Sequence, residues 1–370
     1  MKNGKHLCSI DMLKSIAAIL TFFFHCQIHL SVQFRWLTPF ISQGAIVMDL
    51  FFILSGYTLY AKYSMQPFEP SAYLKFYGRR LYSIYPMYAL IMLAFWIVPA
   101  WRLPVKDVFI SLPVELLLLQ SWFPGMFSVG HNGGTWFLSC IMSCYIVFPL
   151  LLTVCRQMQK RALRLVTATC YILCSVIPIM TIHFAIVTAY SNPLIRMLQF
   201  FSGMMLAKQI DSEDAHRATS YNFQFAFWLA IISGIALCVA VTWLWEIEYL
   251  RGSYIGYGFV TFPLFLLMIK GFVTAEREYN RDIKSKRLWH ILGNHSYAIF
   301  MAQFFVWQPV REIKAKFPWY FTFHGNIKTF ALATMLCTVV AIVLQDCFNA
   351  PVQRFIKNMT EKERINAMVD

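Results

Sequence analysis

Long apolar stretches occupy most of this 370-residue chain and constrain its fold more than any other feature. Most are roughly 20 residues long, the length that an α-helix needs to cross the hydrocarbon core of a bilayer. The stretches lie at residues 7–30, 44–61, 81–101, 134–154, 163–187, 194–207, 222–245, 254–273, 288–307 and 328–348. The sequence therefore predicts an all-α fold, a polytopic membrane helix bundle of about ten transmembrane helices.

The composition excludes a soluble globular protein. Hydrophobic residues make up 58% of the chain and charged residues only 14%. Soluble domains contain about 45–50% apolar and about 25% charged residues. No soluble-sized gap separates the apolar stretches, so we expect residues 1–370 to form a single membrane-embedded domain.

Lysine and arginine are unevenly distributed between the loops, and this asymmetry sets the expected orientation. Placing both termini in the cytoplasm also places most basic clusters there, with residues 349–370 as a short cytoplasmic tail. This arrangement requires that the apolar segment 108–122 makes no net crossing. Topology and contact with anionic lipids account for most of the formal net charge of +14, so we expect no nucleic-acid partner.

The first apolar stretch carries ionisable residues, which inside a membrane usually mark function. Lys14 and His25 are eleven residues apart. In a helix this separation is about three turns plus about 20°, so they share one face about 16 Å apart along the axis. The imidazole of His25 suits general-base work on a hydroxyl group near neutral pH. The alternatives are a snorkelling Lys14 and a His25 that only bonds across a helix interface.

The second apolar stretch runs in the opposite direction and contains Asp49. Asp49 and His25 are each about five residues from the outer end of their helices, so their expected depths match. A carboxylate beside an imidazole fixes its tautomer and stabilises its charged form. We therefore expect Asp49 to act with His25, whereas Ser55 and Gly56 are small residues suited to close helix packing.

A series of motifs follows in order along the chain. They are Lys14 and His25 with ten residues between them, Asp49-Leu-Phe-Phe-Ile-Leu-Ser-Gly56, Phe76-Tyr-Gly-Arg-Arg-Leu-Tyr-Ser-Ile-Tyr-Pro86, Gly134-Thr-Trp-Phe-Leu-Ser139, Tyr145, Pro149, Phe200-Phe-Ser-Gly203, Leu292-Gly-Asn-His-Ser-Tyr297, Pro351 and Arg354. Each fragment is weak alone, but their order covers nearly the whole chain. Together they resemble the acyltransferase-3 family of bacterial integral membrane O-acyltransferases, of the stand-alone type.

The resemblance implies a multi-pass enzyme of the bacterial inner membrane that takes an acetyl or related short acyl group from acetyl-coenzyme A. It implies that His25 is the essential catalytic residue and Lys14 its basic partner, and that Arg79 and Arg80 form the family's cationic motif. The expected acceptor is a hydroxyl of a cell-envelope carbohydrate. Acetyl-coenzyme A would be a cosubstrate, with no tightly bound cofactor, and the sequence is compatible with a homodimer.

Placing these residues on the expected topology gives a mechanism as a hypothesis. Lys14, Arg79 and Arg80 would hold the coenzyme A phosphates on the cytoplasmic side. His25 and Asp49 would activate the acceptor hydroxyl nearer the outer side. The remaining candidates for substrate binding are Trp136, Ser139, Arg196 and Tyr297. Both direct transfer and a covalent acyl carrier remain open.

Four positions depart from the family pattern: Ser83 in place of an arginine, Ile141 in place of a glutamate, Gln303 in place of a histidine, and Asn349 in place of a glutamate. No Cys or His spacing predicts a metal site. The alternative function is a transporter or flippase of an envelope saccharide or lipid-linked precursor. Against that alternative, we find no inverted repeat of Gly/Pro-broken helices. A non-enzymatic membrane scaffold is a further alternative.

Overall fold

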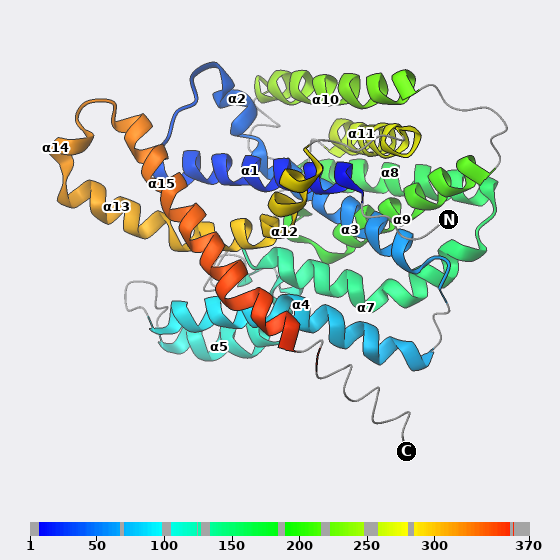
Figure 1. The fold of residues 1–370 in the computed structure, drawn as a ribbon, viewed down its shortest axis with the longest axis horizontal. Helices are drawn as coiled ribbons and strands as arrows, with labels where there is room; N and C mark the ends of the chain where they lie inside the picture. Colours follow the sequence, from blue (N-terminus) through cyan, green and yellow to red (C-terminus); the bar gives the residue numbers. More distant parts are fainter. Residues whose placement is uncertain are drawn as a thin grey trace.

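The computed structural model describes residues 7–66, 70–97, 105–123, 125–126, 134–183, 189–215, 223–247, 258–279, 285–355 and 358. Throughout these ranges all regular secondary structure is helical, which confirms the predicted all-α fold (Figure 1). The longer helices are α1 (Cys8–Leu30), α3 (Val47–Tyr63), α4 (Pro70–Ile97), α5 (Val105–Leu116), α7 (Trp136–Gln157), α8 (Lys160–His183), α9 (Pro193–Ala215), α10 (Phe223–Trp245), α11 (Gly258–Glu278), α12 (Lys286–Ala302), α13 (Trp307–Lys316) and α15 (Gly325–Ile342). The shorter elements are the helices α2 (Thr38–Ile41) and α14 (Pro318–Phe321), the 3-10 turns η1 (Arg35–Leu37), η2 (Gly44–Ile46), η4 (Gln120–Trp122), η5 (Ala189–Ser191) and η7 (Gln303–Phe305), and the π-helix η8 (Val343–Asn349).

Six helical segments in the described ranges are long and apolar enough to cross a membrane, so the chain is a multi-pass membrane protein. These segments are Cys8–Leu30, Arg35–Tyr63, Trp136–Gln157, Phe223–Trp245, Gly258–Glu278 and Gly325–Phe355. The other expected spans fall on α4, α8, α9 and α12. About ten crossings and two cytoplasmic termini therefore stay predictions.

Two parts of the expected topology can be compared with helix lengths. Helix α5 covers most of the segment expected not to cross and has 12 residues. At 1.5 Å per residue it is about 18 Å long, short of the roughly 30 Å of a bilayer core. The last helical segment continues to Phe355, beyond residue 349, where the tail was expected to begin. Residues 359–370 of that tail lie outside the described residues.

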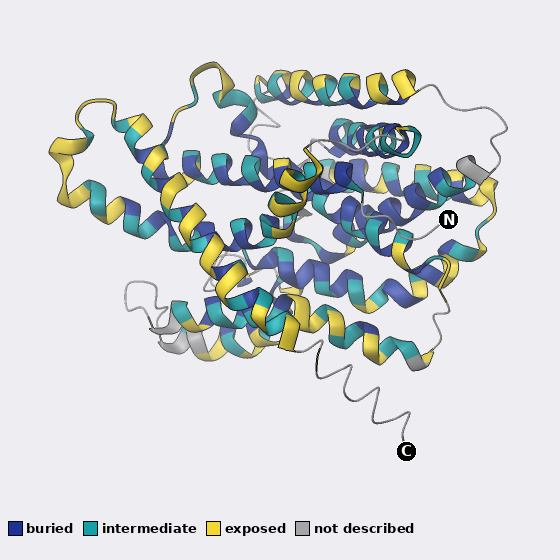
Figure 2. Cartoon of the chain, viewed as in Figure 1, coloured by how far each residue is buried: buried dark blue, intermediate teal, exposed yellow. Residues whose placement is uncertain are grey.

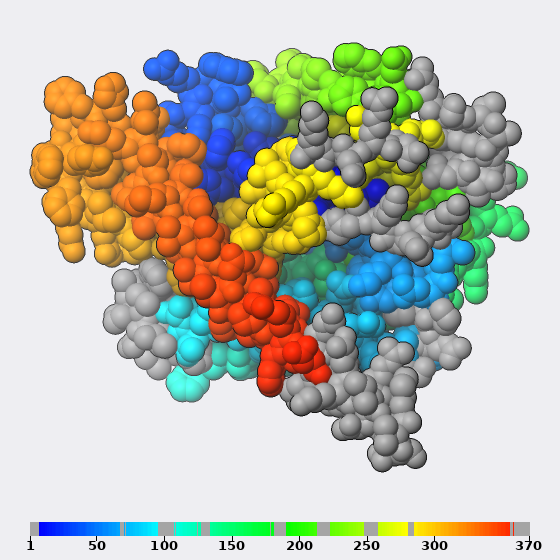
Figure 3. Space-filling view, viewed as in Figure 1, coloured from blue at the N-terminus to red at the C-terminus, as the bar shows by residue number. Residues whose placement is uncertain are grey.

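Burial separates a central group of helices from peripheral ones (Figure 2). In the most apolar part of the segment Arg35–Tyr63, 72% of the residues are buried, against 28% for α10 and for the segment containing α15. Helix α15 crosses obliquely over the face of the molecule shown in Figure 3. The exposed residues of α10 include Phe225, Trp228, Ile232 and Val239, which are apolar. Helices α10 and α15 therefore have the surface expected of lipid-facing helices.

Helices α3 and α9 pack with their backbones almost in contact. A Cβ atom on Gly56 would lie 1.8 Å from the carbonyl oxygen of Phe200, and one on Gly203 would lie 1.9 Å from that of Ile53. Small residues allow this approach in membrane helix pairs, which agrees with the packing role expected for Gly56. The contact joins the helix that carries Asp49 to the helix that carries Arg196.

Charged side chains also hold the ends of two central helices. The Glu276 carboxylate on α11 accepts hydrogen bonds from the backbone N–H groups of Cys8 and Ser9, each at 2.7 Å. This carboxylate satisfies donors that the first turn of α1 leaves unpaired, and it complements the helix dipole. Lys208 Nζ donates to the carbonyl oxygen of Cys155 at 2.7 Å and thereby caps the C-terminus of α7. Helix α1, which carries Lys14 and His25, is thus anchored at its N-terminus.

Candidate functional site

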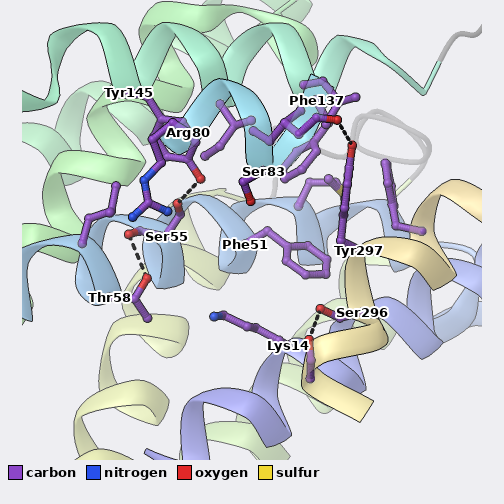
Figure 4. Close-up of a pocket in the computed structure, with 17 residues that line it drawn as sticks. Lys14, Phe51, Ser55, Thr58, Arg80, Ser83, Phe137, Tyr145, Ser296 and Tyr297 are labelled. Atoms are coloured by element: carbon purple, nitrogen blue, oxygen red, sulfur yellow. Dashed lines mark hydrogen bonds between the residues drawn. The ribbon is translucent and has the colours of Figure 1, made fainter. Parts of the chain in front are cut away.

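A cavity of about 290 Å³ opens between α1, α3, α4, α7 and α12 (Figure 4). Its polar lining comes from Lys14, Ser55, Thr58, Arg80, Ser83, Tyr145, Ser296 and Tyr297. Its apolar lining includes Met48, Phe51, Phe137, Leu138, Ile141 and Phe300. Cavities that bind small molecules are typically mostly apolar, with a few placed polar groups. This cavity is the candidate binding site.

Two cations face this cavity from different helices. Lys14 extends from α1 into the open space, and Arg80 reaches it from α4 (Figure 4). Within the described part of the chain, Lys14 forms no hydrogen bond or ion pair. The Arg80 guanidinium lies 5.5 Å from the ring centroids of Phe76 and Tyr145, and its buried Nε has no hydrogen-bond partner among the described residues. The cavity therefore presents positive charge that a bound anion could neutralise.

The neighbouring Arg79 does not reach the cavity. Its side chain is exposed, and its Nε donates to the Lys75 carbonyl oxygen on the same helix at 3.1 Å. Consecutive helical residues point about 100° apart, so only one of the two arginines can face α1. Of the expected donor-binding residues, the structure brings together Lys14 and Arg80 and separates Arg79 from them.

The candidate substrate-binding residues are also divided. Tyr297 lines the cavity, and its hydroxyl donates to the Ile84 carbonyl oxygen at 3.2 Å. Trp136 and Ser139 do not line it, because they lie on other faces of α7 than Phe137 and Ile141. The Ser139 hydroxyl instead accepts from the Ser121 backbone N–H at 3.2 Å. In this structure Ser139 joins helix α7 to the preceding turn.

His25 lies farther along α1 than the cavity, among aromatic rings. Its ring centroid is 6.0 Å from that of Phe304 and 6.1 Å from that of Trp307. Phe304 is in turn 5.9 Å from Phe300, which belongs to the cavity wall. Phe300 and Phe304 thus link the cavity wall to His25 by ring contacts.

The expected contact between Asp49 and His25 is wrong. His25 Nδ1 lies 2.6 Å from Oε1 of Gln303, and Asp49 Oδ1 accepts a hydrogen bond from Nη1 of Arg196. The other oxygen of Asp49, Oδ2, is buried with no hydrogen-bond partner in the described ranges. The prediction rested on the similar depth of Asp49 and His25 in the membrane. In the structure, the packing of α3 on α9 turns the Asp49 side chain towards α9.

Arg196 is wholly buried, and most of its N–H donors are used within the protein. Beyond its ion pair with Asp49, Nη1 donates to Gln199 Oε1 at 2.8 Å and Nε to the Tyr190 carbonyl oxygen at 2.9 Å. The guanidinium carbon lies 5.0–5.3 Å from the ring centroids of Tyr190, Trp136 and Phe52. Four of the five N–H donors of Arg196 thus have partners inside the protein, which is the position of a packing residue, and its expected role as a substrate ligand stays a prediction.

Three of the four departures from the family pattern lie at the cavity or beside His25. Ser83 and Ile141 both line the cavity. Gln303 holds His25, an interaction that sequence reasoning missed although the position itself stood out. Asn349 lies in η8 and donates to Gln345 Oε1 at 3.1 Å. In the described ranges no group of three or more His, Cys, Asp or Glu residues could hold a metal ion.

Comparison with known proteins adds a family assignment to this geometry. A family model described as an acyltransferase domain matches residues 8–346, which include every site residue discussed above except Asn349. Acyltransferase MdmB of Streptomyces mycarofaciens is 29% identical over 182 residues, covering 44% of this chain and 46% of the relative. The match thus spans just under half of the curated relative's length. No solved structure matches.

Proposed function

The chain belongs to the acyltransferase-3 family, and from this premise we propose that it moves an acetyl or related short acyl group from acyl-coenzyme A to a hydroxyl of a cell-envelope carbohydrate. The observation that carries the donor part is the cavity that Lys14 and Arg80 share, in which neither cation forms an ion pair among the described residues. The family and the named relative are acyltransferases, which argues against the alternative of a transporter.

Lys14 and Arg80 would bind the phosphates of coenzyme A. Arginine offers paired N–H donors that match phosphate oxygens, and lysine adds a compact positive charge. Lys14 and His25 lie on one helix about 16 Å apart along its axis. In coenzyme A an extended pantetheine arm separates the phosphates from the thioester. The spacing therefore suits a donor whose phosphates lie at Lys14 and whose thioester lies near His25, with Phe300 and Phe304 moving aside.

His25 would act as the general base. It takes the proton of the acceptor hydroxyl as the oxygen forms a C–O bond to the thioester carbonyl carbon. The C–S bond then breaks, and the departing thiolate receives the proton from the imidazolium. The products are an acyl ester and free coenzyme A thiol. The family assignment and the position of His25 among aromatic rings support this role.

Donor binding can be tested by replacing the two cations of the cavity, with the neighbouring Arg79 as a control. Arg80→Ala and Lys14→Ala should each weaken donor binding about 10–100-fold, because each removes a contact to a charged group worth about 1.5–3 kcal/mol. Arg79→Ala is the matched control, since Arg79 is exposed and bonds only its own helix in the described structure. The measurement is the apparent KM for acetyl-coenzyme A with purified protein in detergent. An equal effect of Arg79→Ala and Arg80→Ala would reject the cavity as the donor site.

The acceptor can be tested in cells. Mass spectrometry of envelope glycans should reveal an O-acyl modification that disappears when the gene is deleted. The modification should return with the wild-type gene but not with a His25→Asn variant expressed at the same level. Envelope glycans that are identical with and without the gene would reject the carbohydrate acceptor and leave the acyltransferase assignment standing.

A further inference from the structure

Gln303 is a buried glutamine whose two amide atoms are both in use. It has no exposed surface and begins the turn η7, directly after α12. Its Nε2 donates to the Phe300 carbonyl oxygen at 2.8 Å, and its Oε1 lies 2.6 Å from His25 Nδ1. Both partners belong to the part of the molecule where the cavity wall meets His25.

Only one orientation of the Gln303 amide fits these two contacts. Rotating the amide by half a turn would place its oxygen against the Phe300 carbonyl oxygen, two acceptors with no proton between them. With Nε2 on Phe300, the atom facing His25 is the acceptor Oε1. The group that faces Oε1 must then be a donor, so Nδ1 of His25 carries a proton.

From this geometry we infer that Gln303 is a positioning residue, which holds neutral His25 as the Nδ1–H tautomer and leaves the lone pair on Nε2 as its basic site. A neutral imidazole has one protonated nitrogen and one acceptor nitrogen. A backbone carbonyl or carboxylate commonly plays this orienting part for histidines in active sites and metal sites. Here a side-chain amide does so, without adding a negative charge to the site.

The surroundings of His25 support this reading. Among the described residues, its hydrogen-bond partner is Gln303, and its ring contacts are Phe24, His29, Phe304 and Trp307. The only hydrogen bond that selects a tautomer in the described structure is therefore the one to Gln303. A buried hydrogen bond of this kind orients the ring as well as its proton.

The tautomer can be observed directly by ¹⁵N NMR of histidine-labelled protein in lipid, with His25→Asn used to assign the His25 signals. We expect a protonated Nδ1 and an unprotonated Nε2 in the wild-type protein at neutral pH. In Gln303→Met, which keeps the length of the side chain but offers only a weakly accepting sulfur, we expect both tautomers. Gln209→Met is the control, because Gln209 bonds Thr167 on α8 and leaves His25 untouched. A protonated Nε2 in the wild type, or an unchanged spectrum in Gln303→Met, would overturn the inference.

Kinetic measurements provide a second test, which distinguishes a positioning role of Gln303 from a packing role. Gln303→Met should lower kcat about 10–100-fold, the usual effect of losing a group that orients a functional histidine. The KM for the donor should stay constant, since Gln303 does not line the cavity. Gln303→Glu restores an oxygen acceptor of the same length towards His25 but loses the donor to the Phe300 carbonyl oxygen, so it should recover only part of kcat. Both kcat values are measured per folded molecule, so that poor folding of Gln303→Met does not affect the comparison. Equal kcat in the Met and Glu variants would then reject the positioning role.

The functional meaning of this inference rests on the proposed role of His25, but the NMR result does not. Loss of the expected tautomer would remove the positioning role of Gln303 while leaving His25 as a candidate base. Full activity of His25→Asn would instead remove the proposed function of His25 while leaving the tautomer assignment intact. The two failures are therefore distinguishable.

Discussion

Replacing His25 should lower acyl transfer about 10²–10⁴-fold, the usual effect of removing a general base. His25→Ala would also leave the buried Oε1 of Gln303 without its donor, at a cost of about 1–3 kcal/mol in stability. His25→Asn is the sharper variant, because the asparagine amide nitrogen occupies a place close to Nδ1 and can donate to Gln303. Asparagine has no atom that can accept a proton at neutral pH. Its activity should be lost while its fold is kept.

The measurement is acyl transfer per folded molecule, with folding checked by thermal unfolding in detergent. His324→Asn is a suitable control, since His324 is exposed in a loop with φ of 53°, a conformation that asparagine tolerates. The control should retain wild-type activity. Near-normal transfer by His25→Asn would exclude His25 as the base and return it to a structural role between helices.

The sequence predicted the features that depend on position along one helix. The apolar stretches predicted an all-α membrane protein, and helical periodicity placed Lys14 and His25 on one face of α1. The structure has Lys14 in the cavity and His25 beyond it on the same helix. Such predictions succeed because rise and rotation per residue are properties of the helix itself.

The features that the sequence could not predict depend on how one helix is turned towards another. Asp49 was matched to His25 by depth alone, but the close approach of Gly56 and Gly203 turns it to Arg196. Arg79 and Arg80 were indistinguishable as neighbours in a motif, yet only Arg80 reaches the cavity. These outcomes are set by contacts between residues distant in the chain, which spacing in one sequence does not reveal.

Breaking the ion pair between Asp49 and Arg196 should destabilise the protein strongly. Both side chains are at most 2% exposed, and a buried charge that loses its partner typically costs about 3–5 kcal/mol. Asp49→Leu and Arg196→Met should each lower the thermal unfolding midpoint in detergent by a large amount. Arg196→Met also removes the bonds to Gln199 and Tyr190, so it should be the more harmful of the two.

The double variant Asp49→Leu/Arg196→Met separates a packing role from a catalytic one. Replacing both members of a buried ion pair with apolar side chains is often close to neutral, so the double variant should be less destabilised than the sum of the single variants. If the pair only holds α3 against α9, transfer per folded molecule should remain near the wild-type value in the double variant. If Asp49 acts on the substrate, the double variant should fold and be inactive. That result would return Asp49 to the catalytic role that its depth in the membrane suggested, and it would require the α3–α9 contact to open during the reaction, since Asp49 is 1% exposed in this structure.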